Sequence, residues 1–281
     1  MLRKRNTKII ATLGPSSSSP SKIHSIFQAG ADIFRLNFSH GSHENHRKTV
    51  FHIRQYEKRL GRPIAILGDL QGPKIRIGMF KKTYELLKNN QRFILDLSPK
   101  LGDCSRVFLP HKEIFKSVKK NNKILIDDGK IILNIEKVSS EQIITQVVNG
   151  GRISNRKGVN IPESFIKMSS LTPKDITDLK LCLDLSLDYI ALSFVQKAKD
   201  IVDLKKYVGN QTGIMAKFEK PMAIKKMDEI LKQCDAAMVA RGDLGVEMPP
   251  EEVPIIQKRI VQSCRDYGIP VVVATQMLDS M

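Results

Sequence analysis

Short apolar runs recur along the chain, and most of them stop at a polar residue or at glycine. Between them lie longer stretches in which apolar residues return every three or four positions. This alternation predicts strands joined by amphipathic helices, the arrangement of a parallel α/β fold. The expected strands are residues 7–13, 31–39, 64–70, 188–195, 213–219, 236–243 and 270–276. The expected helices are residues 20–29, 43–60, 175–185, 198–208, 223–233 and 251–267.

The middle of the chain has a different pattern. From about residue 76 to 169 the helical period disappears, and short β-rich runs such as FILDL and QIITQVV succeed one another. The sequence Asp127-Asp128-Gly129, between two such runs, is typical of a hairpin turn. We therefore predict an all-β lid domain at residues 76–169, inserted after the third strand of a catalytic domain that comprises residues 1–75 and 170–281.

The seven strands expected outside this insertion suggest an α/β fold of the (β/α)8 barrel type, incomplete by one strand. Polar residues stand at the carboxyl ends of these strands, and in such a barrel all of these ends meet at one mouth. The side chains expected there are Arg35, Asn37, Ser39, Asp69, Lys74, Arg76, Ser193, Lys217, Glu219, Arg241, Asp243 and Thr275.

Two pairs of charged residues give this set its chemistry. Lys217 and Glu219 are two positions apart, as are Arg241 and Asp243, so each pair is expected on one side of its strand. Carboxylates on neighbouring strands suit Mg²⁺ or Mn²⁺, and arginines and lysines around them suit phosphate. A lysine beside a metal can stabilise a transferring phosphoryl group or an enolate oxygen. Any one of these residues alone is better explained as a structural salt bridge; the whole set favours a functional site.

Composition and charge exclude few classes of protein. The 281-residue chain has a formal net charge of +17, but its lysines are spread along the sequence without interleaved aromatic residues, so we expect no nucleic-acid partner. No apolar run approaches the roughly 20 residues needed to cross a bilayer, so we expect no membrane partner. The four cysteines form no C-x-x-C pair, which favours reduced thiols and a cytoplasmic location.

Histidines near residue 43 form a competing candidate for a metal site. His40, His43 and His46 are spaced three apart, with Glu44 among them. No fourth ligand or supporting carboxylate is in view, so we do not expect metal binding there. The chain also has neither a Walker A motif nor a G-x-G-x-x-G, and we expect no nucleotide binding by those routes.

Ordered blocks of sequence run along the whole chain. They are TKIIATLGPSS (7–17), FRLNFSHG (34–41), GDLQGPKIRIG (68–78), IDDG (126–129), KGVNIP (157–162), LTPKD (171–175), IALSFV (190–195), AKFEK (216–220), VARGDLGVE (239–247) and VVVATQMLDSM (271–281). These blocks resemble those of pyruvate kinase. The resemblance implies a barrel domain, a β-rich lid inserted after the third strand and a C-terminal α/β domain. It implies phosphoryl transfer from phosphoenolpyruvate to ADP, with Mg²⁺ or Mn²⁺, giving pyruvate and ATP in glycolysis, and a homotetramer for the full-length family.

The resemblance assigns catalytic roles to five residues. Lys217 would stabilise the phosphoryl group in flight, and Glu219 and Asp243 would hold the divalent metal. Arg35 would bind substrate phosphate, and Thr275 would lie near the point where the enolate is protonated.

Binding roles are implied for a second set of residues. Gly242 would offer its amide to the substrate carboxylate, Arg76 would bind phosphate at the nucleotide site, and Lys157 on the lid would reach the nucleotide phosphates. The positions that match the family's monovalent-cation site are Asn37, Ser39, Asp69 and the carbonyl of Leu70.

Two departures from the family pattern concern that cation site. Members that need K⁺ usually carry glutamate where this chain has Lys74, and threonine where it has Leu70. The lysine can place its ammonium where the ion would lie, so we expect activity that is independent of K⁺.

The sequence as given ends at Met281, just after the seventh expected strand. For residues 1–281 alone we expect an open barrel with unpaired strand edges, low stability and little activity. The alternatives are an inactive or split fragment of a pyruvate kinase, a Mg²⁺-dependent 2-oxo-acid lyase or aldolase on a related barrel, and a basic nucleic-acid-binding module.

Overall fold

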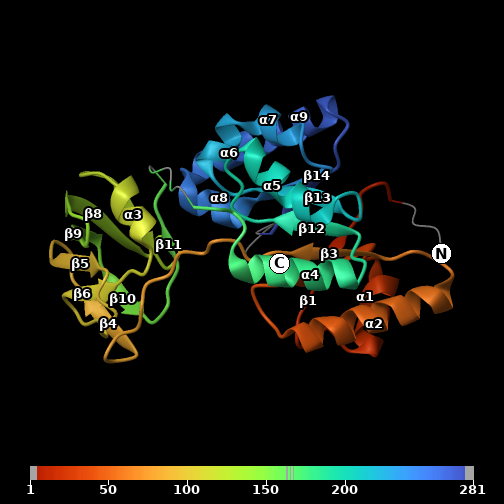
Figure 1. Cartoon of the computed structure of the whole chain (residues 1–281), viewed down its shortest axis with the longest axis horizontal. Coiled ribbons are helices and arrows are strands. Elements are labelled where there is room, and N and C mark those ends of the chain that lie inside the picture. The colour runs from red at the N-terminus through yellow and green to blue at the C-terminus, as the bar shows by residue number, and fades with distance from the viewer. Residues whose placement is uncertain (1–4, 163, 165, 167, 276–281) are drawn as a thin grey trace.

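The computed structural model describes residues 5–162, 164, 166 and 168–275. Figure 1 shows two lobes. One is formed by the middle of the chain, residues 75–166, and is called the lid lobe below. The other is formed by the remaining described residues from both ends of the chain and is called the barrel lobe. No helix in the described part of the chain is both long and apolar enough to span a membrane.

The barrel lobe is built on a curled sheet of seven parallel strands, in the order β1-β2-β3-β12-β13-β14-β15. This sheet confirms the predicted parallel α/β fold and all seven expected strands. The predicted end of the last strand at Gln276 lies outside the described residues. The bounds are β1 (Ile10–Leu13), β2 (Ile33–Asn37), β3 (Ala65–Asp69), β12 (Tyr189–Leu192), β13 (Gly213–Phe218), β14 (Ala236–Ala240) and β15 (Val271–Ala274).

Helices cover the outer side of this sheet (Figure 1). Their ends carry the expected signals: the Ser19 side chain caps the first helix, and Gly61, with a φ of 60°, ends the second. The bounds are α1 (Pro20–Ala29), α2 (His43–Leu60), α4 (Pro173–Asp184), α5 (Ala198–Val208), α6 (Pro221–Lys225), α7 (Met227–Leu231), α8 (Arg241–Glu247) and α9 (Val253–Asp266), the last preceded by a 3-10 turn at Pro250–Glu252.

Two predicted elements are wrong in detail. The strand expected at residues 236–243 ends at Ala240, where the apolar run ends, and the chain turns directly into α8. Arg241 and Asp243 therefore lie in the first turn of a helix and do not share one side of a strand. The helix expected at residues 223–233 is divided into α6 and α7 at Lys226, and each half buries its own apolar residues.

Alternation along the strands divides the apolar residues of the barrel lobe between two faces. Ala216 and Phe218 of β13 pack outward in the large core under the helices. Met215 belongs instead to a small cluster on the inner face, together with Leu67 of β3 and Ala191 of β12. Each of these three inner-face residues precedes a polar residue by two positions, and this spacing directs those polar side chains toward the mouth.

The lid lobe has its own hydrophobic core. It contains a sheet of six strands in the order β11-β7-β8-β9-β5-β6 and a separate pair, β10-β4. The turn predicted at Asp127-Asp128-Gly129 is confirmed, because it joins the antiparallel β7 and β8 and all three residues have positive φ. The bounds are β4 (Tyr84–Leu87), β5 (Arg92–Asp96), β6 (Arg106–Phe108), β7 (Lys123–Ile126), β8 (Ile131–Val138), β9 (Gln142–Asn149), β10 (Gly151–Ser154) and β11 (Val159–Asn160).

The description of the lid as all-β is wrong in one element. Residues 112–117 form a short helix, α3 (Lys112–Ser117). Ile114 is 0% and Phe115 4% exposed, so this helix closes one side of the lid core. Six residues are too few to show a helical period in the sequence, and for this reason the pattern missed it.

A single buried carboxylate fixes the two places where the chain crosses between the lobes. Asp175, at the start of α4, is 0% exposed. Its Oδ1 accepts a hydrogen bond from the Gly72 amide at 3.0 Å, before the chain enters the lid lobe. Its Oδ2 accepts from the amide and the hydroxyl of Thr172 at 2.9 and 2.6 Å, after the chain has returned. The bases of both crossings are therefore held at one point.

Candidate active site

The strand periodicity of β13 places Lys217 and Glu219 at the mouth of the barrel. Both come after Met215 on the inner face, and Phe218 between them faces the outer core. Lys217 is 8% and Glu219 1% exposed. A buried lysine beside a buried glutamate at a strand end is the central feature of this site.

The Lys217 ammonium is held by three oxygens. Its Nζ lies 2.8 Å from Glu219 Oε1 and 3.2 Å from Asp69 Oδ1, and it donates a hydrogen bond of 2.8 Å to the Ser193 hydroxyl. The three oxygens belong to the residue just after β13, the last residue of β3 and the residue just after β12. Neighbouring strands of the sheet thus converge on one cation.

Electrostatics keep this lysine charged. Burial by itself lowers the pKa of the Lys217 ammonium, but carboxylates around it outweigh burial, so that its pKa lies above the usual value. The carboxylates that raise it belong to Glu219, Asp69 and Asp243. Asp243, in the first turn of α8, contributes the least of the three.

Glu219 is fixed at both of its oxygens. Oε1 contacts the Lys217 ammonium, and Oε2 accepts a hydrogen bond of 2.8 Å from the Phe194 amide. Burial raises the pKa of the Glu219 carboxyl, and the Lys217 charge opposes that rise. Because both oxygens act as acceptors, the geometry is that of a carboxylate paired with an ammonium.

Arg35 forms the neighbouring part of the mouth. Its Nε donates to Asp69 Oδ2 at 2.7 Å, and its Nη1 donates to the Thr12 hydroxyl at 3.0 Å. Asp69 is 1% exposed and therefore lies between two cations, Arg35 and Lys217. The guanidinium is partly exposed and faces the same mouth.

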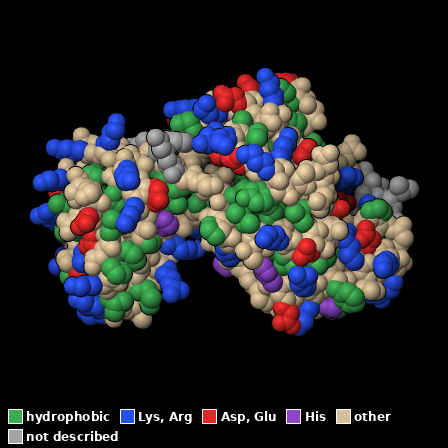
Figure 2. All heavy atoms as spheres, in the orientation of Figure 1, with side chains coloured by type: hydrophobic (Ala, Val, Ile, Leu, Met, Phe, Trp, Pro, Cys, Tyr) green, Lys and Arg blue, Asp and Glu red, His purple; other side chains and the backbone are tan. Residues whose placement is uncertain are grey.

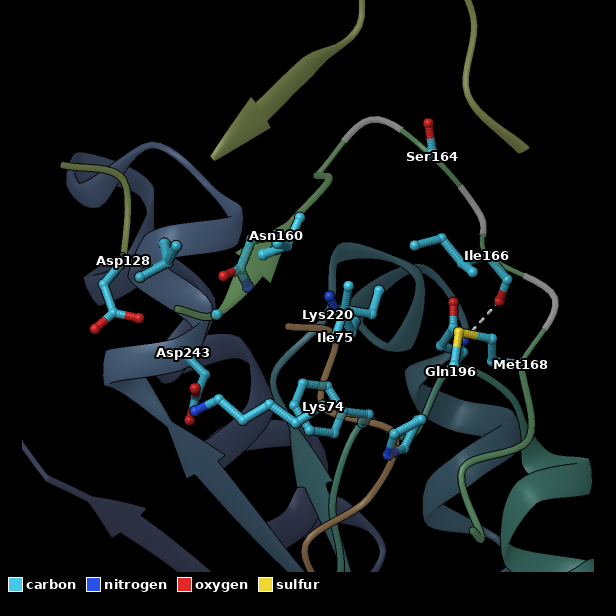
Figure 3. A pocket seen from close by; sticks show the side chains of 15 residues that line it. Lys74, Ile75, Asp128, Asn160, Ser164, Ile166, Met168, Gln196, Lys220 and Asp243 are labelled. Atoms are coloured by element: carbon cyan, nitrogen blue, oxygen red, sulfur yellow. Dashed lines mark hydrogen bonds between the residues drawn. The ribbon is translucent and has the colours of Figure 1, made fainter. Parts of the chain in front are cut away.

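Asp243 is exposed and lines a pocket between the lobes. In Figure 3 the Lys74 side chain extends toward the Asp243 carboxylate, with Asp128 of the lid lobe nearby. Lys220 and Phe194 also line this pocket, next to the site built around Glu219. The pocket therefore lies between the buried charge cluster and the lid.

Two of the remaining expected residues make their contacts within the lid lobe. Arg76 donates to the Arg156 carbonyl at 2.8 Å, within the lid lobe. The Lys157 ammonium lies 2.9 Å from Asp127 Oδ1. Both side chains are thus engaged by lid residues rather than by the charge cluster around Lys217.

Two further positions lie at the ends of β14 and β15. Gly242 is in the first turn of α8. Thr275 comes directly after β15 with a φ of 53°, and its carbonyl accepts a hydrogen bond from Arg241. Arg241 also donates to the Ala274 carbonyl at 3.4 Å, so it ties the start of α8 to the end of β15.

The expected monovalent-cation ligands all lie at the ends of β2 and β3. Asn37 Oδ1 accepts a hydrogen bond of 3.0 Å from the Ser39 amide, and the Leu70 carbonyl accepts one of 2.7 Å from the Ser193 hydroxyl. Asp69 is paired with Arg35 and Lys217. Three of the four expected ligands therefore already use their oxygens within the protein.

The histidines near residue 43 make protein contacts. His43 Nε2 lies 2.6 Å from Asp178 Oδ1, and Asp178 Oδ2 accepts a hydrogen bond of 2.6 Å from Lys174. His46 Nε2 lies 3.0 Å from the His40 carbonyl. This cluster connects α2 with α4.

Sequence reasoning assigned no role to Ser193 and Phe194, although both hold the central charges of the site. Ser193 links Lys217 to the Leu70 carbonyl, and the Phe194 amide holds Glu219. The sequence predicts Ser193 at the mouth, because it comes at the end of an apolar strand, but indicates no partner for it. The amide of Phe194 leaves no trace in the sequence.

Two carboxylates of this site are candidates for holding a divalent metal. In the described part of the chain, no group of three or more His, Cys, Asp or Glu side chains is placed to hold a metal ion. Glu219 and Asp243, however, follow the neighbouring parallel strands β13 and β14 at the same end of the sheet. Mg²⁺ is commonly held by one or two carboxylates, with water and substrate phosphate as the other ligands. The pair therefore fits a metal that binds together with a phosphorylated substrate.

Comparisons with known proteins agree on one family. A family model described as pyruvate kinase, barrel domain, matches residues 4–281. The chain is 50% identical over 281 residues to a pyruvate kinase of Methylorubrum extorquens, and 51% identical over 279 residues to one of Agrobacterium vitis. It spans 59% of the length of each of these curated relatives, which cover 100% and 99% of this chain.

A solved structure shows the same architecture. The crystal structure of a pyruvate kinase from Cryptosporidium parvum matches with a TM-score of 0.95 at 34% sequence identity. The match covers 98% of this chain and 59% of that chain. Together with the observed sheet, it confirms the predicted fold class, a barrel-type α/β fold with an inserted lid.

Proposed function

The chain belongs to the pyruvate kinase family, and we propose that it carries the catalytic centre for phosphoryl transfer from phosphoenolpyruvate to ADP, giving pyruvate and ATP. One observation supports this proposal most strongly. The buried Lys217 ammonium stands at the mouth of the barrel 2.8 Å from Glu219, and Asp243 follows the neighbouring strand β14 and lines the adjoining pocket. A fixed cation next to paired carboxylates suits the charge that develops during phosphoryl transfer.

Lys217 and Arg35 are the groups proposed to act on the phosphate of the substrate. The Lys217 ammonium is fixed by Glu219 and Ser193, so it needs no rearrangement when negative charge develops on the transferring group. Arg35 presents a partly exposed guanidinium that suits the same phosphate. The two cations together orient the phosphoryl group and stabilise its charge.

Glu219 and Asp243 are the residues proposed to hold Mg²⁺ or Mn²⁺. When bound, the ion would neutralise charge on the phosphate and enolate oxygens. The protein's own contribution is orientation: the Phe194 amide and the Lys217 ammonium fix Glu219, and α8 presents Asp243 to the pocket. The Gly242 amide, in the same turn of α8, is proposed to bind the substrate carboxylate.

The remaining roles belong to residues on the rim of the site. Thr275, at the carboxyl end of β15, is proposed to hold the proton path to the enolate carbon. Arg76 and Lys157 are proposed to bind nucleotide phosphates, and for Lys157 this requires release from Asp127. We place the reaction in cytoplasmic glycolysis, and family membership implies a homotetramer for full-length members.

Lys74 supports a proposal that turnover does not require K⁺. Asp69, the carboxylate among the expected cation ligands, already lies between the Arg35 and Lys217 cations. Lys74 lies at the same mouth, with its side chain directed toward Asp243. Its ammonium can supply the positive charge that the ion supplies in relatives with glutamate at this position.

The test of K⁺ independence replaces K⁺ with tetramethylammonium at constant ionic strength. We expect the rate of the wild-type chain to remain unchanged, and a Lys74→Glu variant to need K⁺ for its remaining activity. A wild-type rate that falls on replacement of K⁺ would contradict the proposal.

The test of the reaction is formation of pyruvate from phosphoenolpyruvate, with and without ADP. We expect pyruvate and ATP in equal amounts. For Asp243→Asn we expect kcat to fall by about 10²-fold or more, the loss that usually follows removal of a preorganised group from an active site. The matched control is Asp235→Asn, because Asp235 bonds the Ile214 amide away from the mouth. Pyruvate formation without ADP, with inorganic phosphate as the second product, would contradict a kinase, because the phosphoryl group would then pass to water. A lyase would instead release pyruvate from a longer 2-oxo acid and leave phosphoenolpyruvate unchanged.

A further inference from the structure

A second buried charge cluster joins the lid lobe to the barrel lobe. Glu247, at the end of α8, is 3% exposed. Its Oε1 accepts a hydrogen bond of 2.6 Å from Asn160 Nδ2, on strand β11 of the lid lobe. The same oxygen accepts a hydrogen bond from the Lys220 ammonium, just beyond the end of β13. Three segments that are far apart in the sequence thus meet at one carboxylate oxygen.

This cluster is a poor source of stability. The other oxygen of Glu247, Oε2, is buried and has no hydrogen-bond partner among the described residues. Burial of an ion pair costs about as much as its attraction returns, and an unsatisfied oxygen adds to the cost. Arrangements of this kind are better explained by the geometry that they specify.

The geometry specified here concerns both metal-binding carboxylates of the proposed site. Glu247 lies one helical turn after Asp243 in α8. Lys220 is the residue after Glu219, and its ammonium lies 5.5 Å from the centroid of the Phe194 ring, whose backbone amide holds Glu219. The Lys220–Glu247 pair therefore connects the helix that carries Asp243 to the strand end that carries Glu219.

Asn160 extends this connection to the lid. It belongs to the segment that contains Lys157 and Gly158, and Gly158 and Asn160 line the pocket next to Asp243. Figure 3 shows Asn160 on the lid side of this pocket and Lys220 on the barrel side. The Asn160–Glu247 hydrogen bond, which crosses between the lobes here, is short and is directed to a charged group.

We propose that the hydrogen bond between Asn160 and Glu247 is a latch that holds the lid lobe closed, and that Glu247 is the positioning residue that couples closure to the placement of Asp243. The functional part of this proposal rests on the proposed kinase reaction, whereas the latch itself does not. Opening of the lid breaks the hydrogen bond from Asn160 and leaves the Lys220–Glu247 pair intact.

The latch can be tested by a distance measurement that needs no turnover. Cys104 is exposed on the lid lobe, whereas Cys182, Cys234 and Cys264 are buried, so Cys104 is a natural site for a spin label. A second label at Gln55→Cys, exposed on α2, reports the distance between the lobes. In the wild type we expect one narrow distance distribution, corresponding to the closed lid.

The decisive variant is Asn160→Ala, and its matched control is Asn149→Ala. Asn149 donates a hydrogen bond of 2.8 Å to the Lys130 carbonyl, so its contact lies within the lid lobe. For Asn160→Ala we expect a closed-to-open ratio about tenfold lower than in the wild type, because a tenfold change in an equilibrium corresponds to the usual free energy of one hydrogen bond to a charged group. The Tm should remain unchanged. The control should give the wild-type distribution. A wild-type distribution for Asn160→Ala would overturn the latch.

A rescue experiment separates the latch from a merely structural role. Asn160→Asp places a second carboxylate against Glu247 and should open the lid further than Asn160→Ala does. Adding Glu247→Gln supplies an amide donor for the introduced aspartate and should restore the closed distance. Failure of this rescue, with an unchanged Tm, would also contradict the proposal.

Mn²⁺ binding in the presence of phosphoenolpyruvate tests the coupling to Asp243. Asn160→Ala should weaken that binding by up to about tenfold, whereas Asn149→Ala should leave it unchanged. Wild-type Mn²⁺ affinity in an Asn160→Ala variant whose lid is open would contradict the coupling. Absence of turnover in the wild type would contradict the proposed reaction but not the latch, which the distance measurement judges separately.

Discussion

The ammonium of Lys217 is buried and charged, and the residues around it explain both properties. Glu219 and Asp69 lie at 2.8 and 3.2 Å from its Nζ and balance its charge, and the Ser193 hydroxyl accepts its third hydrogen bond. The strand spacing of two predicts that Lys217 and Glu219 share a face. The sequence did not indicate that Asp69, expected as a ligand of a monovalent cation, is paired with Lys217 and Arg35.

Replacement of Lys217 by methionine should remove the contact that stabilises developing charge at the site. We expect kcat to fall by about 10²–10³-fold in the coupled pyruvate assay, the usual loss for one preorganised donor. The Tm should also fall, because Asp69 and Glu219 would be left buried without their common cation.

Two controls separate these effects. Lys217→Arg keeps the positive charge and should lower the Tm less than Lys217→Met does. Lys199→Met removes an exposed ion pair with Asp203 and should change neither value. A Lys217→Met variant with full turnover would contradict the catalytic role of this ammonium.

Other residue-scale features could not be read from the sequence. No single motif contains Asn160, Lys220 and Glu247. They come together only when the chain folds. Glu247 has the appearance of a surface glutamate on a short helix, yet it is 3% exposed. Burial of this kind depends on the position of the lid, which local pattern does not encode.

At the scale of elements, the apolar runs predicted the strands of the barrel lobe closely, but they did not show where strand ends become helices. Ala236–Ala240 forms β14 as expected, and Arg241–Glu247 forms α8 rather than the end of the strand. Glycine and charged residues stop a buried strand, but they do not by themselves specify the next element. The consequence for function is that Asp243 is presented by a helix.

The capping box of α4 is the element that anchors both crossings between the lobes. Thr172→Ala should destabilise the protein by about 1 kcal/mol, the usual cost of a lost N-cap. Asp175→Ala should cost more, about 2–4 kcal/mol, because it also leaves the buried Gly72 amide without its acceptor. Urea unfolding measures both values.

Asp175→Ala should also weaken turnover, since Gly72 precedes Lys74 in the crossing that it anchors. A Cβ is not tolerated at Gly72 itself: it would lie 2.7 Å from the Phe194 ring. Equal costs for Thr172→Ala and Asp175→Ala would contradict the double anchoring by Asp175.

At the scale of the whole molecule, the change of pattern near residue 76 predicted a separate β-rich unit, and the structure contains two distinct large cores. The periodicities could not predict how closely the lid lobe approaches the barrel lobe, because that distance depends on a few polar contacts. Figure 2 shows lysine and arginine side chains over much of the visible lid surface. They are part of the net charge of +17 and are distributed rather than gathered into one patch.

The two cores should respond to mutation separately. Phe93 in the lid core and Phe34 in the barrel core are both 0% exposed, and each substitution to alanine should cost about 3–5 kcal/mol. In hydrogen exchange monitored by mass spectrometry, Phe93→Ala should speed exchange in lid peptides and Phe34→Ala in barrel peptides. Equal acceleration throughout the chain for both variants would show one cooperative unit and contradict the separation.

Mn²⁺ binding measured by electron paramagnetic resonance tests the convergence of Glu219 and Asp243 most directly. In the presence of phosphoenolpyruvate, we expect the wild-type chain to bind one Mn²⁺, and Asp243→Asn and Glu219→Gln each to weaken that binding by about tenfold or more. Asp128→Asn removes a lid carboxylate from the same pocket and should leave the affinity nearly unchanged. Wild-type affinity in both Asp243→Asn and Glu219→Gln would contradict the account.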